Sequence, residues 1–158
     1  MAAKLQFSEL DQYLFGQGTH YDIYKKLGAH PTTQGRKKGV YFAVWAPNAR
    51  SVSVVGDFND WNPQTNPMQK LGSIGVYELF VPEARIGDLY KFYIIGYHGE
   101  EIYKADPYGN EAELRPGTAS RITDITSYKW KDSTWMKKRP EFNENTDAMS
   151  IYEVHPGS

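Results

Sequence analysis

The residues best suited to chemistry lie in one short turn at residues 56–62, Gly-Asp-Phe-Asn-Asp-Trp-Asn, directly after a strand-like run over residues 50–55. An indole face can cover the apolar C–H face of a glucose ring, while amides, acids and lysines reach its hydroxyl groups. This turn therefore predicts a sugar platform made by Trp61 and Asn59. The alternative is that Trp61 folds back and plugs the end of a β-sandwich. Asp57 and Asp60 are expected to cap the turn around Asn59.

The elements that must position this turn have the pattern of short strands. From Gly39 the hydrophobic residues follow a period of two, with Val40, Phe42 and Val44 on one face. Further strands are expected over residues 50–55, 76–81, 89–95, about 101–104 and 118–125. Because Gly and Pro turns separate these strands, the sequence predicts an all-β fold, an immunoglobulin-like antiparallel β-sandwich. Strand spacing by itself does not distinguish a sandwich from a barrel.

The regions flanking the predicted sandwich have a different character. Residues 1–35 are expected to form an N-terminal arm with a short helix from Ser8 to Gly16 and a turn over 22–27 capped by Asp22. The sandwich is expected over 36–126 and an irregular connector over 127–148. Trp130 and Trp135 are too large to stay exposed in a connector, so we expect them to pack against the sandwich or a following domain. Residues 149–158 would begin that domain.

Composition excludes several classes of function. The 158 residues carry a net charge of −1, which provides no general field for nucleic acid. Cysteine is absent, and four scattered histidines (His20, His30, His98 and His155) do not form a metal-binding pattern. We therefore expect neither cofactor nor metal. The sequence contains no signal peptide or apolar membrane span, so we expect a cytoplasmic monomer that contacts no membrane.

Three motifs together resemble a known family. These are Phe-Ala-Val-Trp-Ala-Pro-Asn-Ala at 42–49, Val-Ser-Val-Val-Gly-Asp-Phe-Asn-Asp-Trp at 52–61 and Leu-Tyr-Lys-Phe at 89–92. They resemble the glycogen-associated carbohydrate-binding module of family 48. Segments at 13–20, 27–31, 113–120 and 149–155 narrow the resemblance to the N-terminal region of bacterial 1,4-α-glucan branching enzymes. The resemblance runs from about Tyr13 to the last residue, with Pro156 where leucine is expected.

The resemblance implies an α-1,4-glucan ligand, such as glycogen or a maltooligosaccharide, and names the residues that would hold it. Trp61 and Lys91 match the main glucan-holding positions of the family. Strand alternation places Lys91 on the face opposite Tyr90 and Phe92, although a solvated lysine is the common case. Tyr103 matches a second aromatic position, and Ser120 replaces the amide of the next loop. Both replacements imply weak binding.

The resemblance also implies what the chain does not contain. The Ile-Tyr-Glu-Val-His segment at 151–155 resembles the first strand of a (β/α)₈ barrel, whose active-site residues lie on several later strands. The implied parent reaction is retaining transfer of a glucan chain to a 6-hydroxyl, with two carboxyl groups downstream of Ser158. No acid in this sequence is therefore assigned as catalytic, and this fragment should be inactive.

Two alternatives stay open. The domain could be purely structural, seating its own catalytic barrel without touching sugar. The parent could also be an isoamylase-type debranching enzyme or a trehalohydrolase, although the segments at 27–31 and 114–120 favour branching.

Overall fold

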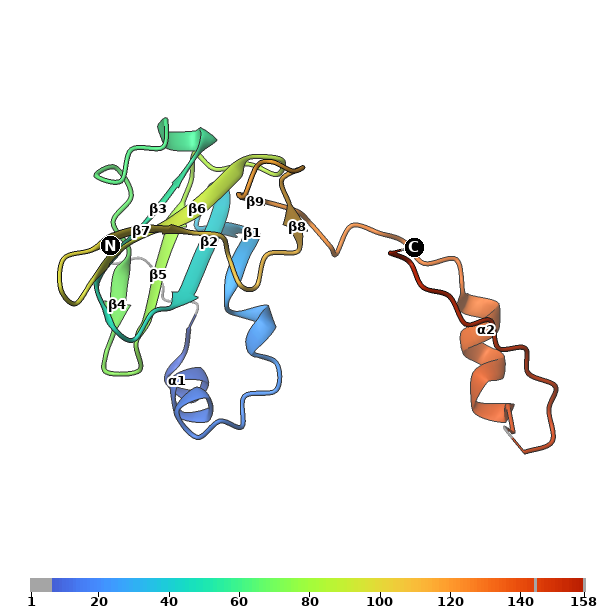
Figure 1. Cartoon of the computed structure of the whole chain (residues 1–158). Coiled ribbons are helices and arrows are strands. Elements are labelled where there is room, and N and C mark those ends of the chain that lie inside the picture. The colour runs from blue at the N-terminus through green and yellow to red at the C-terminus, as the bar shows by residue number, and fades with distance from the viewer. Residues whose placement is uncertain (1–6, 144, 158) are drawn as a thin grey trace. The chain divides into compact units, whose positions relative to one another are not determined.

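Two antiparallel sheets pack face to face in the computed structural model, which describes residues 7–143 and 145–157 (Figure 1). The first sheet has the strand order β1 (Gly28–Gln34), β2 (Lys37–Trp45), β5 (Val76–Val81) and β4 (Gln69–Leu71). The second has the order β3 (Ala49–Gly56), β6 (Leu89–Gly96), β9 (Ser120–Arg121) and β8 (Glu111–Ala112), and β7 (Glu101–Lys104) also pairs with β6. The all-β sandwich predicted from the sequence is confirmed.

The main core lies between the two sheets. Period-two alternation directs Val40, Phe42 and Val44 of β2 inward, and they meet Val54 of β3 and Phe92 of β6. All five side chains are buried. The alternation read from the sequence of β2 therefore identified the core face correctly.

The opposite face of the first sheet is also buried. Helix α1 (Glu9–Gly16) and the 3₁₀ turn η1 (Ile23–Lys25) lie over it as a third layer. A second hydrophobic cluster joins this arm to the sheet, made of Phe7, Leu27, Tyr41, Ala43, Leu71 and Val76. Strand β2 is consequently buried on both faces, and the arm is an integral part of the fold.

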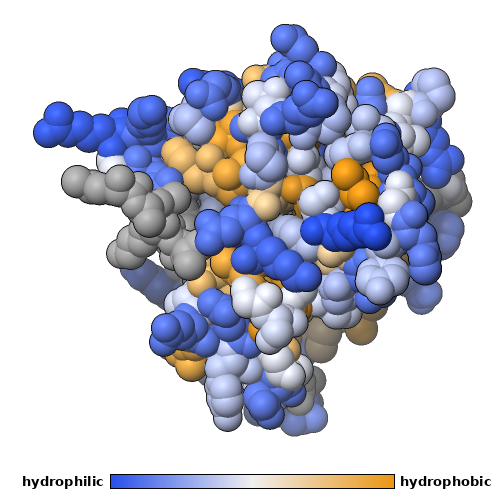
Figure 2. Space-filling model, turned by 90° about the vertical axis from the view of Figure 1, so that its left-hand side faces the viewer, coloured by the Kyte–Doolittle hydropathy of each residue, from blue (hydrophilic) through white to orange (hydrophobic). Residues whose placement is uncertain are grey.

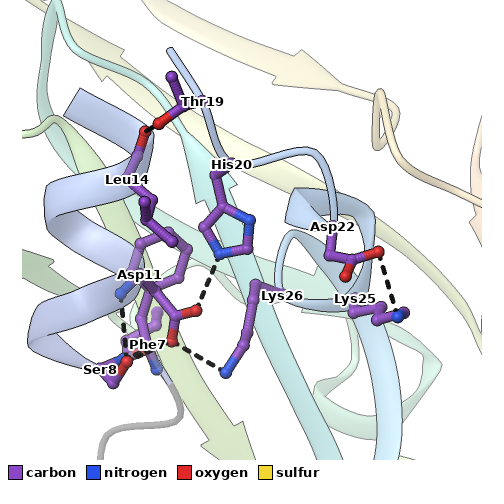
Figure 3. Close-up of polar contacts among 10 residues, drawn as sticks. Phe7, Ser8, Asp11, Leu14, Thr19, His20, Asp22, Lys25 and Lys26 are labelled. Carbon is purple, nitrogen blue, oxygen red and sulfur yellow. Dashed lines mark hydrogen bonds and ion pairs between the residues drawn. The ribbon is translucent and has the colours of Figure 1, made fainter. Parts of the chain in front are cut away.

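A carboxylate ties the arm together (Figure 3). Asp11 accepts hydrogen bonds from the backbone N–H and hydroxyl of Ser8, and the Ser8 hydroxyl accepts from the Asp11 N–H, which completes a capping box. His20 Nε2 and Lys26 Nζ lie 2.8 and 2.9 Å from the Asp11 carboxylate oxygens. Burial opposes ionisation of Asp11, but hydrogen bonds from Ser8, Lys26 and His20 outweigh it and hold its pKa well below the usual value.

A second buried acid joins the arm to the sheet. Glu78 of β5 accepts hydrogen bonds from the Tyr41 hydroxyl and, at 3.4 Å, from the Phe7 N–H. Burial raises the pKa of Glu78, although the Tyr41 hydrogen bond opposes that change. The carboxylate is thus satisfied by one residue from the sheet and one from the arm.

The structure departs from the sequence expectations in three places. Strand β1 lies inside the segment expected to be a helical arm, and its Pro31 is tolerated because β1 is an edge strand. Asp22 makes no side-chain cap bond, because the turn is only three residues long. Its Oδ1 instead lies 3.1 Å from Lys25 Nζ. The strand expected over 118–125 is reduced to Ser120–Arg121.

Residues 126–158 form a second compact unit. It contains α2 (Ser133–Lys138) and the 3₁₀ turn η3 (Arg139–Glu141). Trp130 contacts Tyr128 edge-on, with 4.8 Å between ring centroids, and Trp135 lies 6.3 Å from Phe142. Residues 151–155 are not paired as a strand. No helix within the described ranges is long and apolar enough to cross a membrane.

Candidate functional site

Asn59 builds the turn that follows β3. Its Oδ1 accepts from the Gly56 N–H at 2.9 Å, and its Nδ2 donates to the Val54 carbonyl at 3.0 Å and to Asn66 Oδ1 at 2.7 Å. Both amide hydrogens are therefore used inside the protein. The structure gives Asn59 a loop-forming role, and the sugar contact expected of it from the sequence stays a prediction.

Phe58, and not Trp61, fills the end of the sandwich. The Phe58 ring packs against the main core and lies 5.6 Å from the ring of Phe42. Trp61 is half-buried and outside both core clusters. The alternative in which Trp61 plugs the sandwich is thus not the arrangement found.

The backbone and Asp57 fix the position of the Trp61 ring. Asp60 and Trp61 have φ angles of 52° and 58°, in the left-handed region that is uncommon for residues other than glycine. Asp57 accepts from the Trp61 indole N–H at 3.2 Å and from the Leu89 N–H at 2.8 Å. Asp57 therefore links the indole to the start of β6, instead of capping the backbone around Asn59 as expected.

Lys91 lies on the outer face of the second sheet. Its neighbours Tyr90 and Phe92 are buried in the main core, so alternation directs Lys91 outward, as predicted. Lys91 pairs in register with Val55, beside the turn that carries Trp61. Its Nζ donates to Thr118 Oγ1 at 2.6 Å. Sequence reasoning missed Thr118, because nothing in its local pattern indicates this long-range contact.

Tyr103 adds an aromatic ring to the same outer face. It pairs in register with Tyr93 of β6, and the two ring centroids are 5.0 Å apart. Tyr103 is 48% exposed, whereas its neighbour Tyr93 is only 9% exposed. Tyr93 and Lys91 are two residues apart on β6 and therefore point to the same side. A hydrogen bond to Glu101, together with burial, raises the pKa of Tyr93.

Ser120 lies inside the sandwich. It is 4% exposed and pairs in register with the buried Tyr90. Its hydroxyl accepts from the Asp106 N–H at 2.9 Å, and Asp106 in turn accepts from the Tyr90 hydroxyl at 2.5 Å. In this position Ser120 holds the loop that follows β7, the strand that carries Tyr103. The sugar contact expected of Ser120 from the sequence stays a prediction.

The outer face therefore brings together three of the five residues named from the sequence. Trp61, Lys91 and Tyr103 lie on or beside it, and Thr118 accepts a hydrogen bond from Lys91, while Asn59 and Ser120 support the backbone from within. Within the described residues, no group of three or more His, Asp or Glu side chains could hold a metal ion. Two aromatic rings and an ammonium group on a sheet face are suited to stacking and hydrogen bonding. These residues do not include the pair of carboxyl groups that glycosyl transfer needs.

A comparison with protein families identifies the family of this chain. The model of carbohydrate-binding module 48, the isoamylase N-terminal domain, matches residues 26–109, which is over half of the chain and includes Trp61, Lys91 and Tyr103. The chain belongs to carbohydrate-binding module family 48.

Two relatives that match nearly all of the chain are branching enzymes. The chain is 53% identical, over all of its 158 residues, to the 1,4-alpha-glucan branching enzyme GlgB of Butyrivibrio fibrisolvens, and it covers 25% of that enzyme. It is 51% identical over 152 residues to the GlgB enzyme of Protochlamydia amoebophila, covering 96% of this chain and 21% of that enzyme. The chain thus spans a quarter or less of the length of these relatives.

Solved structures share the fold. A maltotriose complex of PulA from Klebsiella pneumoniae matches 63% of this chain and 11% of its own, with a TM-score of 0.51 and 25% identity. A putative alpha amylase from Salmonella typhimurium matches 70% of this chain and 17% of its own, with a TM-score of 0.53 and 22% identity. A sandwich of this fold therefore forms a small part of each of these two proteins.

Proposed function

We propose that this module binds α-1,4-glucan on the outer face of its second sheet, as the glucan-binding part of a glycogen branching enzyme. The observation that carries the proposal is the division of roles in the turn after β3. Phe58 closes the sandwich, which leaves Trp61 outside the core beside Lys91. A sugar ring would stack on Trp61 while Lys91 and Thr118 donate to its hydroxyl groups.

The predicted interaction is weak. Tyr103 offers a smaller ring than tryptophan, and Lys91 and Thr118 are the two polar side chains that would hold the sugar beside Trp61. Because a glucan is flexible and strongly hydrated, the cost of ordering it offsets much of what these contacts contribute. Binding to isolated maltooligosaccharides is therefore expected in the millimolar range, with tighter retention on polymeric glycogen.

Titration of the 158-residue chain with maltoheptaose, followed by two-dimensional NMR, tests this proposal. Saturable shifts of the Trp61 indole N–H and of amides beside Lys91 are expected. Trp61→Ala and Lys91→Ala should each weaken the shifts at least several-fold, whereas Trp130→Ala, which removes an exposed indole in the other unit, should leave them unchanged. A folded chain whose outer-face signals stay fixed at millimolar sugar would refute the proposal.

For the parent protein, we propose retaining transfer of an α-1,4-glucan chain to a 6-hydroxyl, with the catalytic carboxyl groups outside this chain. The two GlgB relatives support a branching parent over a debranching one. The 158-residue chain alone should leave the iodine absorbance of amylose unchanged.

The competing candidate is a purely structural module that seats a catalytic barrel. Large apolar side chains exposed on the first sheet and on the arm favour it, among them Trp45 of β2 and Leu10 of α1. The titration separates the two candidates, because a purely structural module gives no saturable shift at Trp61.

A further inference from the structure

A hollow lies at the end of β3 that is remote from Trp61. Its volume is about 660 Å³, and it is formed by the turn before β3, by β4 and by the hairpin between β6 and β7. Its polar and aromatic side chains are Asn48, Arg50, Lys70, Tyr97, His98 and Glu100. None of these residues takes part in the outer-face site described above.

We propose that this hollow is a second α-glucan subsite, with Tyr97 as its aromatic platform. The proposal rests on the proposed function, since it assigns the same class of ligand to a separate surface. Tyr97 is 70% exposed, so its ring is available for stacking. Asn48 in the turn before β3 and Arg50 at the start of β3 supply donors, and Glu100 supplies an acceptor from the hairpin.

The hairpin holds these groups in a defined arrangement. The Gly96 N–H donates to the Glu100 carbonyl at 2.9 Å, and the His98 N–H donates to Glu100 Oε2 at 3.0 Å. The Tyr97 and His98 rings are in edge contact, with centroids 5.2 Å apart. A Cβ at Gly96 would clash with the Glu100 side chain, so glycine leaves the room that the carboxylate occupies. The acceptor is thus positioned before any ligand arrives.

The mixed charge of the hollow favours a neutral sugar over an anion. Arg50 and Lys70 would attract phosphate, but the Glu100 carboxylate lies in the same hollow and would repel it. Donors beside an acceptor match hydroxyl groups, which both accept and donate. Figure 2 views the molecule from the side on which the β6–β7 hairpin lies in Figure 1, and shows mainly hydrophilic residues with apolar patches between them. A mixed surface of this kind suits a hydrated sugar.

The spacing of the two subsites would let one glucan polymer occupy both of them. Arg50 and Gly56 are six residues apart on β3, so the subsites are separated by roughly 20 Å at about 3.3 Å per residue. A branched polymer presents many chain ends, and two of them could occupy both subsites at once. Simultaneous binding raises the apparent affinity by effective concentration, without any new contact. The module would therefore retain glycogen better than it binds a short oligosaccharide.

The test is a maltoheptaose titration of the 158-residue chain and two single variants, followed by NMR. In Trp61→Ala, saturable shifts at the amides of Tyr97, His98 and Glu100 should persist. In Tyr97→Ala those shifts should disappear while the Trp61 indole still responds. In affinity electrophoresis through glycogen, either variant should weaken retention on the order of 100-fold. Tyr24→Ala, which removes an exposed aromatic on the arm, is the matched control and should change nothing.

The outcomes distinguish this inference from the proposed function. If the Trp61 signals respond to sugar and the hairpin signals do not, the second subsite is overturned while the outer face stands. If the hairpin responds and Trp61 does not, the subsite is supported and the outer face is overturned. If neither responds, both are overturned. Hairpin shifts produced by inorganic phosphate, with none from maltoheptaose, would also overturn a sugar subsite.

Discussion

At the residue scale, two aromatic side chains three positions apart have opposite roles. Phe58 packs against Phe42 in the main core, while Trp61 is held outside it by a left-handed backbone and by Asp57. Neighbouring aromatic residues in one turn look alike in sequence, and burial decides which of them stabilises the fold. The outer one remains for binding.

Phe58→Ala should therefore cost more stability than Trp61→Ala, whereas Trp61→Ala should cost more of the glucan response. Truncating Phe58 leaves a cavity beside Phe42 and should lower the free energy of unfolding by about 3 kcal/mol. Trp61→Ala should lower it by less than about 1 kcal/mol, because the indole is outside the core clusters, while weakening the glucan response of the amides beside Lys91 at least several-fold. Urea unfolding of both variants measures the difference. Equal losses of stability would mean that Trp61 also serves as a core residue.

At the element scale, the hydrophobic pattern of the sequence predicted the strands that have one face in the main core and the other outside it. The alternation of β2 and of Leu89–Gly96 identified the inward residues, because one face of each strand contacts the core between the sheets. Ser8 as an N-cap and Gly16 as the end likewise predicted α1, since both signals are local to the helix. Local chemistry was sufficient for these elements.

Other parts depended on long-range contacts that no local pattern contains. Strand β1 lacks clear alternation, because its inward side chains are small and Pro31 interrupts it. Ser120 lies inside while the irregular path between β8 and β9 brings Thr118 to Lys91, whereas a continuous strand over 118–125 would direct both side chains to the same face. A site assembled across such a path is predictable only once the strand register is known.

The arm over the first sheet should give the module a measurable pH dependence. The folded pKa of Asp11 lies below its ordinary value of about 4, so its ionised form stabilises the fold above that pH. This contribution declines as pH falls through 4 towards the folded pKa. Asp11→Asn should therefore be less stable than the wild type at pH 7, with the difference shrinking below pH 4.

Urea unfolding at about pH 7, 5 and 3.5 measures this effect across the range in which an acid with an ordinary pKa near 4 gains its proton. Asp22→Asn is the matched control, because its carboxylate pairs with Lys25 on the exposed surface and should contribute almost nothing at any of these pH values. A constant difference between wild type and Asp11→Asn across the three pH values would show that the carboxylate acts only through its shape and not through its charge.

At the scale of the whole molecule, the two compact units differ in how they are stabilised. In the part of the chain that the structure describes, every buried side chain belongs to the unit that ends at Ile125. In the unit beginning at Thr126, Trp130 is 76% exposed and the apolar side chains of Ile151 and Tyr152 are exposed as well. Since buried apolar contacts supply most of the stability of a fold, the second unit opens at much lower cost.

Limited trypsin digestion should therefore cut the second unit first. Lys129 and Lys131 lie in backbone without helix or strand, whereas Lys91 is in the central strand of a sheet. A fragment ending at or near Lys129 should accumulate, because cleavage needs a locally unfolded backbone, which the sandwich provides only on global unfolding. That fragment should still give the maltoheptaose response at Trp61, since all the residues of the outer face precede Ile125. Early cutting within 36–121, at a rate equal to that at Lys129, would contradict the stability difference between the units. Loss of the sugar response in an intact fragment would instead mean that residues after Lys129 contribute to binding.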